Sequence, residues 1–220
     1  MAGTLVGAPR PCLGMTEQRE QSVTDSFPST DRVRIERVET LSANWGKLRK
    51  YTIAYRRGDG VTEEQSREVY DRGNGAAILL YNKQRRTIVL TRQFRLPALL
   101  NGHPDGMLLE APAGLLDADD PVTAIRREAE EETGYRVTDV KEVLAAIMSP
   151  GSVTERLHLF TAEYKAADRV SAGGGHKGEG EDIEVVEVTI DRALAMIEAR
   201  EIVDAKTIML VYHARLKNLI

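Results

Sequence analysis

The alternation of apolar and polar residues predicts short β-strands on both sides of one central helix. The strands expected before that helix span residues 33–40, 51–57, 67–71, 75–81 and 87–92. Those expected after it span residues 141–148, 157–165 and 183–188. Gly58-Asp59-Gly60 is typical of a hairpin turn, and residues 41–50 are expected to connect the first two strands.

The central helix is predicted over residues 121–133 by its end signals and its apolar spacing. Asp120 can cap the N-terminus, Pro121 suits the first helical position because it lacks an N–H, and Gly134 supplies the stop. Residues at helical spacing form one buried stripe, namely Val122, Ile125 and Ala129. The helix is therefore expected to be short, with one apolar face.

Two closing helices are expected over residues 191–199 and 205–216, each with apolar residues at i, i+3 and i+4. This order of elements favours an α/β fold, built as an α/β/α sandwich. We expect a disordered leader over residues 1–30, an N-terminal β-rich element over residues 31–72 and a main domain over residues 73–220. Either Met1 or Met15 can be the native start.

The composition is that of an ordinary globular protein and excludes several other classes. Of the 220 residues, 42% are hydrophobic and 29% are charged. The net charge of −4 gives no general attraction to nucleic acid or to an anionic membrane, and no apolar run reaches membrane-spanning length. The single cysteine, Cys12, excludes an intrachain disulfide and favours a reducing cytoplasm. We therefore expect neither nucleic-acid nor membrane partners.

Glutamates on the central helix are the strongest chemical signal in the chain. Glu128 and Glu132 are four residues apart with Glu131 beside them, so their carboxylates share a neighbouring face. Like charges at this spacing cost only about 0.2–0.5 kcal/mol per pair, so a solvated acidic face is the simple alternative. A metal site is the functional one, because Mg²⁺ binds through a few carboxylates together with phosphate oxygens.

The surroundings of these glutamates resemble the Nudix box, a loop–helix–loop that holds divalent metals against a diphosphate. The matching segment follows the Ala113-Gly114 loop and reads Arg127-Glu128-Ala129-Glu130-Glu131-Glu132-Thr133-Gly134-Tyr135. This sequence departs from the usual box in two ways. Asp120 stands where glutamate is usual, and six residues rather than seven separate it from Arg127.

The resemblance implies a set of metal-binding residues. Glu128, Glu132 and the carbonyl of Ala113 would bind the metal, which would be Mg²⁺ or alternatively Mn²⁺. Glu131 would be a further ligand or a partner of the ligands, and Arg127 would orient the acidic cluster. Together these groups would offset the charge of a pyrophosphate link and position an attacking water.

Segments outside the box resemble the Nudix pyrophosphatases that act on ADP-ribose and GDP-mannose. Residues 67–75 and the strand end at residues 92–95 match both groups. Residues 149–151, 172–182 and 204–207 look closer to the GDP-mannose branch. That branch is dimeric, exchanges N-terminal elements between subunits and splits GDP-mannose into GMP and mannose 1-phosphate. The resemblance therefore implies a nucleotide-sugar substrate and a homodimer.

Three other functions remain as alternatives. ADP-ribose is the second candidate substrate. A nucleotide-sugar sensor that has lost catalysis is a weaker alternative, because such proteins typically lose box glutamates and this chain keeps them. An RNA-decapping enzyme is disfavoured by the acidic charge balance and by the lack of a basic stripe interleaved with aromatic residues.

The resemblance also assigns substrate contacts along the chain. Arg67 and Arg95 are candidates for the diphosphate or the sugar, since guanidinium groups bind phosphate oxygens in pairs, although a surface arginine is usually only solvated. Trp45 would lie against the nucleobase, but a lone tryptophan is as often a core or interface residue. The other candidates are Glu68, a hydrogen-bond acceptor for base or sugar, Gly114 and Leu115 in the box, and Glu155 and Lys206 on the base or sugar side.

The glycine-rich loop over residues 172–182 supplies the candidates for the general base. Glu181 is favoured as the residue on the metal side, and Glu179 is the second candidate for the base. Three consecutive glycines impose no preferred dihedral angle, so the loop is expected to be mobile without ligand and to close over the diphosphate. The histidines show no metal-ligand spacing and are assigned no chemistry.

Overall fold

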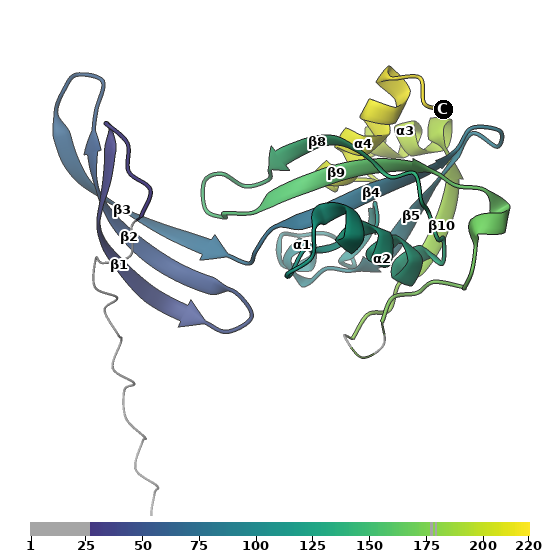
Figure 1. Cartoon of the computed structure of the whole chain (residues 1–220), viewed down its shortest axis with the longest axis horizontal. Helices are drawn as coiled ribbons and strands as arrows, with labels where there is room; N and C mark the ends of the chain where they lie inside the picture. The colour runs from purple at the N-terminus through teal and green to yellow at the C-terminus, as the bar shows by residue number, and fades with distance from the viewer. Residues whose placement is uncertain (1–26, 177, 179) are drawn as a thin grey trace, which may run out of the picture. The chain divides into compact units, whose positions relative to one another are not determined.

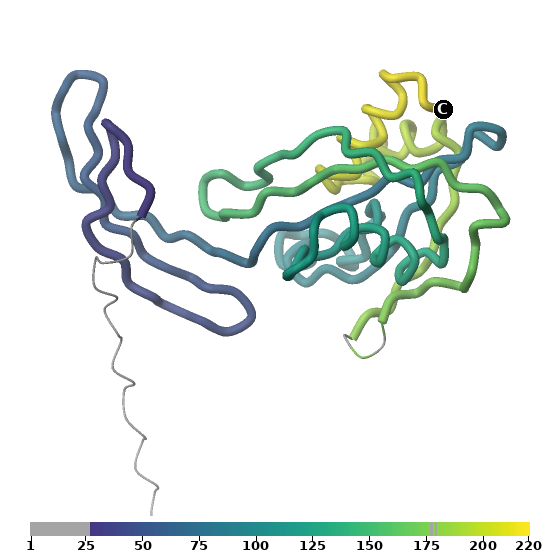
Figure 2. Tube along the Cα trace, in the orientation of Figure 1, coloured from purple at the N-terminus to yellow at the C-terminus, as the bar shows by residue number. Residues whose placement is uncertain are grey.

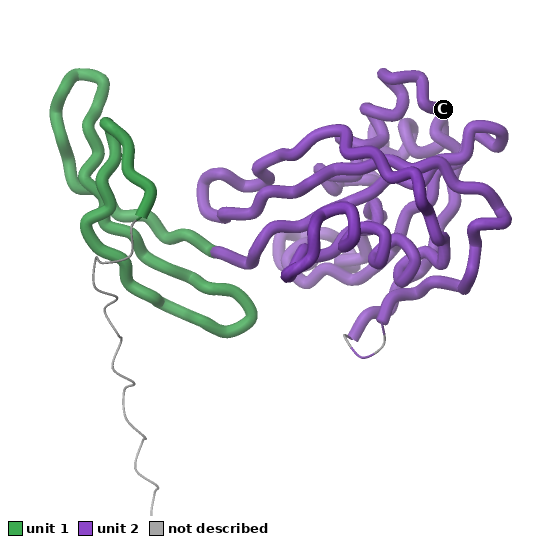
Figure 3. Tube along the Cα trace, viewed as in Figure 1, with its two compact units in different colours: residues 1–70 green, residues 71–220 purple. Residues whose placement is uncertain are grey.

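The computed structural model of this chain describes residues 27–176, 178 and 180–220. Most of the expected leader, including Cys12 and Met15, lies outside the described residues, as does Glu179. The chain divides after Tyr70 into two compact units, drawn in green and purple in Figure 3. No helix among the described residues is long and apolar enough to cross a membrane.

The first unit is a three-stranded sheet in the order β1-β2-β3. Its strands are β1 at Val33–Ala43, β2 at Lys47–Arg56 and β3 at Thr62–Asp71. β1 and β2 extend further than expected and reduce their connection to residues 44–46. The predicted turn at residues 58–60 is confirmed, and Gly60 has a φ of 87° there. Val38 is the one buried apolar side chain in the described part of this unit, so the sheet has little core of its own.

The second unit is built on a mixed sheet whose main path runs β10-β5-β4-β9-β8 (Figure 1). The strands are β4 at Gly75–Asn82, β5 at Thr87–Phe94, β8 at Lys141–Ile147, β9 at Arg156–Glu163 and β10 at Glu184–Thr189. β4 and β9 run parallel, whereas the other neighbours on this path are antiparallel. Every residue of β4 is buried, which explains its nearly continuous apolar sequence.

Helices cover both faces of this sheet. They are α2 at Pro121–Thr133, α3 at Ile190–Glu198 and α4 at Ala205–Leu216. Ile125 of α2 belongs to the same apolar cluster as Ile78 of β4, whereas Leu79 of β4 belongs to the cluster of Leu210 on α4. Successive side chains of a strand point to opposite faces, so β4 contributes to both clusters. The predicted α/β/α sandwich with a β-rich N-terminal element is therefore confirmed.

Two short strands that the pattern does not predict pair with β4 and β5 beyond the point where these two strands pair with each other. β6, at Met107–Glu110, pairs with the second half of β5, and β7, at Ala113–Leu115, pairs with the first half of β4. The interpretation of Ala113-Gly114 as a loop is therefore wrong. Strands of four and three residues hold too few alternating positions to be recognised from sequence. Two other short elements were also not predicted, α1 at Leu96–Leu100 and the 3₁₀ turn at Ala166–Asp168.

Candidate active site

The ends of α2 fix the position of the glutamates that the helix carries. Asp120 caps the N-terminus, where its Oδ1 accepts hydrogen bonds from the N–H groups of Val122 at 3.0 Å and Thr123 at 3.1 Å. Gly134 ends the helix in a left-handed conformation with φ 78°. Both predicted end signals are confirmed. We call the side of α2 that carries Glu128, Glu131 and Glu132 the glutamate face. The two end signals and the apolar stripe that packs on the sheet together determine which way this face points.

Glu132 is the buried member of the glutamate face. Its residue surface is 2% exposed, and its Oε2 accepts a hydrogen bond from the backbone N–H of Ala113 at 3.3 Å. Burial, followed by the nearby charges of Glu128 and Glu181, raises the pKa of Glu132 to about 8. The hydrogen bond from Ala113 acts in the opposite direction but does not outweigh these causes. The structure therefore places Glu128, Glu132 and Glu181 within electrostatic reach of one another.

Glu128 packs directly over Gly114 of β7. A Cβ atom added to Gly114 would lie 2.3 Å from Cδ of Glu128, so a larger residue there would require the Glu128 side chain or the strand to move. Arg127 holds the cluster from one side, with its Nη1 3.1 Å from Oε1 of Glu128 and 3.7 Å from Oε2 of Glu131. The orienting role of Arg127 stays a prediction, and its guanidinium lies within reach of both carboxylates.

Glu130 faces away from the cluster. Its carboxylate forms a paired contact with Arg136, with N–O distances of 2.8 and 2.7 Å. The hydrogen bonds from Arg136 lower the pKa of Glu130 below its ordinary value. An exposed ion pair accounts for this glutamate without any catalytic role.

The glycine-rich segment lies between β9 and β10 along the chain. It passes the C-terminal end of α2 (Figure 2). The N–H of Gly174 donates to the carbonyl of Glu132 at 2.9 Å, and that of Gly175 donates to the carbonyl of Glu131 at 3.1 Å. Gly173, Gly174 and Gly175 all have positive φ angles. A Cβ on Gly173 would lie 2.5 Å from the carbonyl oxygen of Glu132. The glycines thus allow close docking of this segment on the helix end.

Docking of this segment brings Glu181 to the glutamate face. Its Oε2 accepts a hydrogen bond from the backbone N–H of His176 at 2.8 Å. A Cβ on Gly175 would lie 2.5 Å from the same oxygen, so a glycine is required there as well. Glu181 is therefore one of the predicted residues that the structure does bring to the site. Glu179, the other loop candidate, lies outside the described residues.

The donor chemistry of this cluster fits a hard divalent cation. Carboxylate oxygens, with a backbone carbonyl, are the ligands that Mg²⁺ and Mn²⁺ accept. Among the described residues, no three acidic, histidine or cysteine side chains are already gathered in the geometry of a metal site. Glu128 and Glu181 instead have their carboxylates engaged by Arg127 and by the His176 amide. Metal binding would therefore require small side-chain movements of Glu128 and Glu181. Of the three glutamates, Glu132 is the one whose carboxylate is best oriented in advance.

A second charged cluster lies at the end of β5 and the start of α4. Glu110 accepts hydrogen bonds from Arg95 at 2.8 and 3.1 Å and from Lys206 at 2.6 Å. Lys206 also lies 3.0 Å from Oδ1 of Asp204, the residue that caps α4. Arg95 is within electrostatic reach of Glu132, so this cluster borders the glutamate face. The structure thus joins two predicted substrate residues through a carboxylate that the sequence did not single out.

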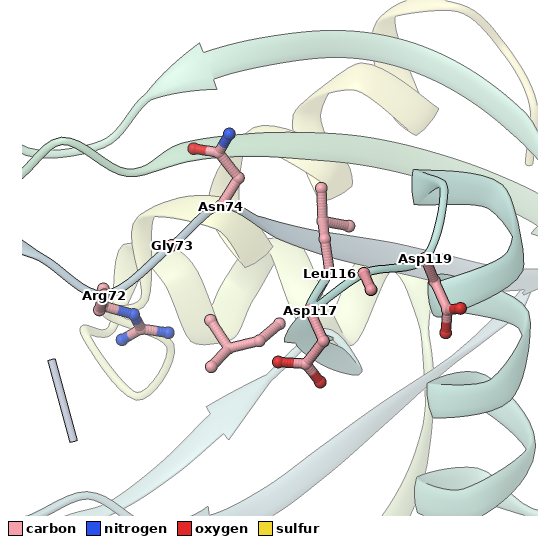
Figure 4. Close-up of a pocket in the computed structure, with 8 residues that line it drawn as sticks. Arg72, Gly73, Asn74, Leu116, Asp117 and Asp119 are labelled. Atoms are coloured by element: carbon pink, nitrogen blue, oxygen red, sulfur yellow. The ribbon is translucent and has the colours of Figure 1, made fainter.

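A pocket of about 240 Å³ opens beside the box segment (Figure 4). Its lining comes from the residues between β3 and β4, from the last residue of β7 and from the connection between β7 and α2, and consists of Arg72, Gly73, Asn74, Leu115, Leu116, Asp117, Ala118 and Asp119. Arg72 contacts Glu155, with 3.3 Å between Nε and Oε1, and Asp119 contacts Arg127 at 3.7 Å. Of the predicted contacts, Leu115 therefore lines this pocket, and Glu155 contacts a residue that lines it.

Three predicted substrate residues belong to the first unit and stay predictions. Trp45, in the connection between β1 and β2, is 70% exposed, which excludes a role in the core of its own unit. Arg67 and Glu68 lie on β3, also at the surface. The guanidinium of Arg67 donates to the carbonyl of Ser66 at 2.8 Å and to the side chain of Gln65 at 2.7 Å.

Glu110 is the residue of the site that sequence reasoning missed. It is the last residue of the short apolar strand β6 and precedes Ala111-Pro112, so this charged residue lies where the chain leaves the sheet. A charged residue directly after an apolar run is a usable signal, but β6 itself was not recognised. Without that strand, nothing in the sequence indicates that the side chain is buried and needs cationic partners.

Two family models match the chain. The model described as GDP-mannose pyrophosphatase NudK N-terminal domain matches residues 32–70, and the model described as NUDIX domain matches residues 71–209. The first match covers the three-stranded unit. The second covers the sandwich with both charged clusters.

Curated relatives are similar over almost their whole length. The chain is 53% identical to the GDP-mannose pyrophosphatase of Yersinia enterocolitica over 190 residues, which cover 86% of this chain and 98% of that protein. It is 52% identical to the GDP-mannose pyrophosphatase of Yersinia pestis, over 84% of this chain and 93% of the relative. The protein of the same name from Cronobacter sakazakii is 51% identical, over 81% and 93% of the two chains.

Proposed function

Because the chain belongs to the Nudix family of hydrolases, we propose that it hydrolyses GDP-mannose to GMP and mannose 1-phosphate. The observation that carries the activity is the glutamate face, in which Glu132 is buried beside Glu128 and Glu181. The names of the relatives, at more than 50% identity, support the choice of substrate. Both parts of the chain contribute to this similarity, because the three-stranded unit also matches a model named for that activity.

The proposed metal is Mg²⁺, with Mn²⁺ as the alternative. Glu128, Glu132, Glu181 and the carbonyl of Ala113 would hold it, with Glu131 as a further ligand or a partner of the ligands. Bound there, the metal would offset the negative charge of the diphosphate and lower the pKa of a water molecule. Arg127 keeps Glu128 and Glu131 in place from the solvent side.

In the proposed reaction, the oxygen of water forms a bond to one phosphorus atom of the diphosphate. The bond between that phosphorus and the bridging oxygen breaks, and the bridging oxygen leaves with the other phosphate. The water gives up a proton to a general base. Glu181 is the first candidate for this base, because the His176 amide orients its carboxylate beside the glutamate face. Glu179 is the second candidate.

Substrate contacts are proposed from both units. Arg95 and Lys206 supply positive charge next to the glutamate face, where a diphosphate and its sugar would lie. The exposed ring of Trp45 suits stacking on a nucleobase. The remaining proposed contacts are Arg67, Glu68, Gly114, Leu115 and Glu155.

The proposed assembly is a homodimer that exchanges N-terminal elements. The described part of the three-stranded unit buries one apolar side chain, Val38. A small sheet with so little core gains stability by packing on another surface, and a second copy of the chain would supply that surface. Light scattering of the purified protein tests this, and a monomer at all concentrations would contradict it.

The substrate proposal is tested by incubating the protein with GDP-mannose or ADP-ribose and Mg²⁺, with chromatography of the released nucleotide. We expect GMP and mannose 1-phosphate from GDP-mannose, and slower release of AMP from ADP-ribose. Glu132→Gln should be inactive. Glu130→Gln is the matched control, because Glu130 lies on the same helix but pairs with Arg136 away from the site. Faster hydrolysis of ADP-ribose than of GDP-mannose would overturn the proposed substrate. Activity in Glu132→Gln would overturn the proposed catalytic site.

A further inference from the structure

We infer that Glu110 is a positioning residue that holds Arg95 and Lys206 together at a fixed spacing beside the catalytic carboxylates. This inference rests on the proposed function, in which Arg95 and Lys206 contact the nucleotide sugar. It adds a residue that itself need not touch the substrate. Its role is to fix the positions of the two cationic side chains that bind the substrate.

One carboxylate serves both cations. Oε1 of Glu110 accepts from Nε of Arg95 at 2.8 Å, and Oε2 accepts from Nη2 of Arg95 at 3.1 Å and from Nζ of Lys206 at 2.6 Å. The Glu110 side chain is 3% exposed, so these contacts replace water as its hydrogen-bond partners. Arg95 follows β5 and Lys206 lies in the first turn of α4, and Glu110 links these two distant parts of the chain.

Both cations keep donors that Glu110 does not use. Arg95 points Nε and Nη2 at the carboxylate, which leaves Nη1 on the outer side of a guanidinium whose side chain is 41% exposed. Lys206 donates one hydrogen bond to Glu110 and forms an ion pair with Asp204, with 3.0 Å between Nζ and Oδ1, which leaves at least one of its three N–H groups for another acceptor. The inner donors therefore anchor each cation, and the outer donors remain for acceptors such as phosphate oxygens or sugar hydroxyls.

The charges of the cluster balance, and that balance depends on Glu110. Two cations face two carboxylates, those of Glu110 and Asp204. Burial alone would favour the protonated form of Glu110, but Lys206 and Arg95 outweigh it and lower its pKa below the ordinary value. Loss of this carboxylate would leave two neighbouring cations to repel each other. They would then separate or rotate, and their outer donors would lose the spacing that suits one substrate.

The test is steady-state kinetics of the full-length protein with GDP-mannose at saturating Mg²⁺. Glu110→Gln should raise KM about tenfold, which is the effect of losing roughly one charged hydrogen bond in substrate binding, while kcat changes much less. Glutamine is the informative replacement, because it keeps the size of the side chain but directs an NH₂ group towards one of the cations.

Thr91→Val is the matched control for a general loosening of this region. The Thr91 hydroxyl donates to the backbone carbonyl of Glu110 at 3.2 Å. The change removes this hydrogen bond to the backbone of Glu110 but leaves the contacts of its carboxylate. We expect a lower melting temperature with an unchanged KM. An equal rise of KM in Thr91→Val and Glu110→Gln would overturn the positioning role.

A double-mutant cycle separates positioning from a purely structural effect. If Glu110 acts through Lys206, then Glu110→Gln should raise KM much less in a Lys206→Met background than in the wild type. Fully additive effects of the two changes would overturn the inference. Glu110→Asp, which keeps the charge but shortens the reach, should give an intermediate KM, and it provides the same cycle if Glu110→Gln does not fold.

Failure of this inference can be told apart from failure of the proposed function. If Arg95→Ala and Lys206→Met leave KM for GDP-mannose unchanged, the proposed substrate contacts are wrong, and the positioning role is overturned with them. If those variants raise KM but Glu110→Gln does not, only the positioning role is overturned. The rise in melting temperature with Mg²⁺ should be the same in Glu110→Gln and the wild type, because Glu110 is not a proposed ligand.

Discussion

The carboxylate of Glu132 accepts a hydrogen bond from the backbone N–H of Ala113, with 3.3 Å between Oε2 and the nitrogen. Ala113 begins β7 and Glu132 lies in the last turn of α2, so the bond joins the strand and the helix that carry the two halves of the proposed metal site. A buried carboxylate held in this way has one oriented oxygen before any metal arrives. This relationship makes Glu132 the first target for mutation.

The stability of the metal-free protein should depend on pH through Glu132. Burial, with the charges of Glu128 and Glu181, raises its pKa from 4.5 to about 8. Between these two values the folded state holds a proton that the unfolded state has lost. The free energy of unfolding should therefore fall as the pH rises through this window. Thermal unfolding in EDTA, from about pH 5 to about pH 9, measures the effect.

Glu132→Gln should remove much of this dependence. At about pH 8 in EDTA the variant should melt above the wild type, because the neutral amide does not need to ionise in a buried position. Its activity should fall by more than about 100-fold, since even groups that only orient metal ligands are worth about 10- to 100-fold. Glu130→Gln should change neither property. An unchanged pH slope in Glu132→Gln would assign the titration to another group.

Gly114→Ala should disable the site by displacing Glu128. The added methyl group would lie 2.3 Å from Cδ of Glu128, a distance that requires the glutamate or the strand to move. We expect weaker Mg²⁺ binding, measured as a higher Mg²⁺ concentration for half-maximal activity. Gly58→Ala is the control, because nothing lies within 4 Å of its added Cβ. Wild-type Mg²⁺ dependence in Gly114→Ala would show that Glu128 adapts without loss of function.

Much of the fold could be predicted because its signals are local. The closing helix was expected over residues 205–216, where α4 lies, since its apolar residues repeat at helical spacing. The ends of α2 followed from Asp120 and Gly134 for the same reason. Strands β6 and β7 could not be predicted, because they are short and exist through pairing with β5 and β4.

The site was predictable where a contiguous motif carries it. The glutamates of α2 and the role of Arg127 came from one run of sequence. The link between Glu110 and Lys206 could not be foreseen, because 96 positions separate the two residues and their contact depends on how α4 packs. The mobility expected of the three glycines stays a prediction, and the structure adds that these glycines allow the chain to dock on the end of α2.

Asp120→Ala should affect stability more than catalysis. Asp120 caps α2 with hydrogen bonds to two backbone N–H groups and to the hydroxyl of Thr123. It stands at the box position where glutamate is usual, yet both of its carboxylate oxygens accept hydrogen bonds within the cap. We expect a melting temperature lower by a few degrees, with kcat close to that of the wild type.

Asp120→Asn provides the comparison for this change. Asparagine caps helices about as well as aspartate, so the variant should recover most of the lost stability. A large loss of activity in Asp120→Asn, at wild-type stability, would show that the charge of Asp120 serves the metal site. The shortened spacing of the box would then be functional rather than incidental.

Glu181→Gln should lower kcat strongly while KM changes little. The carboxylate is oriented by the His176 amide and lies near Glu132, where an attacking water would be activated. Loss of a general base typically costs about 10²- to 10⁴-fold in rate. The measurement needs saturating Mg²⁺, so that weaker metal binding is not mistaken for a lost base. Glu184→Gln is the control, because Glu184 lies on β10 and pairs with Arg92 at 3.7 Å. If Glu179→Gln is the more damaging change, the roles of the two loop glutamates are exchanged, and if neither change matters, Glu131 on α2 becomes the base to test.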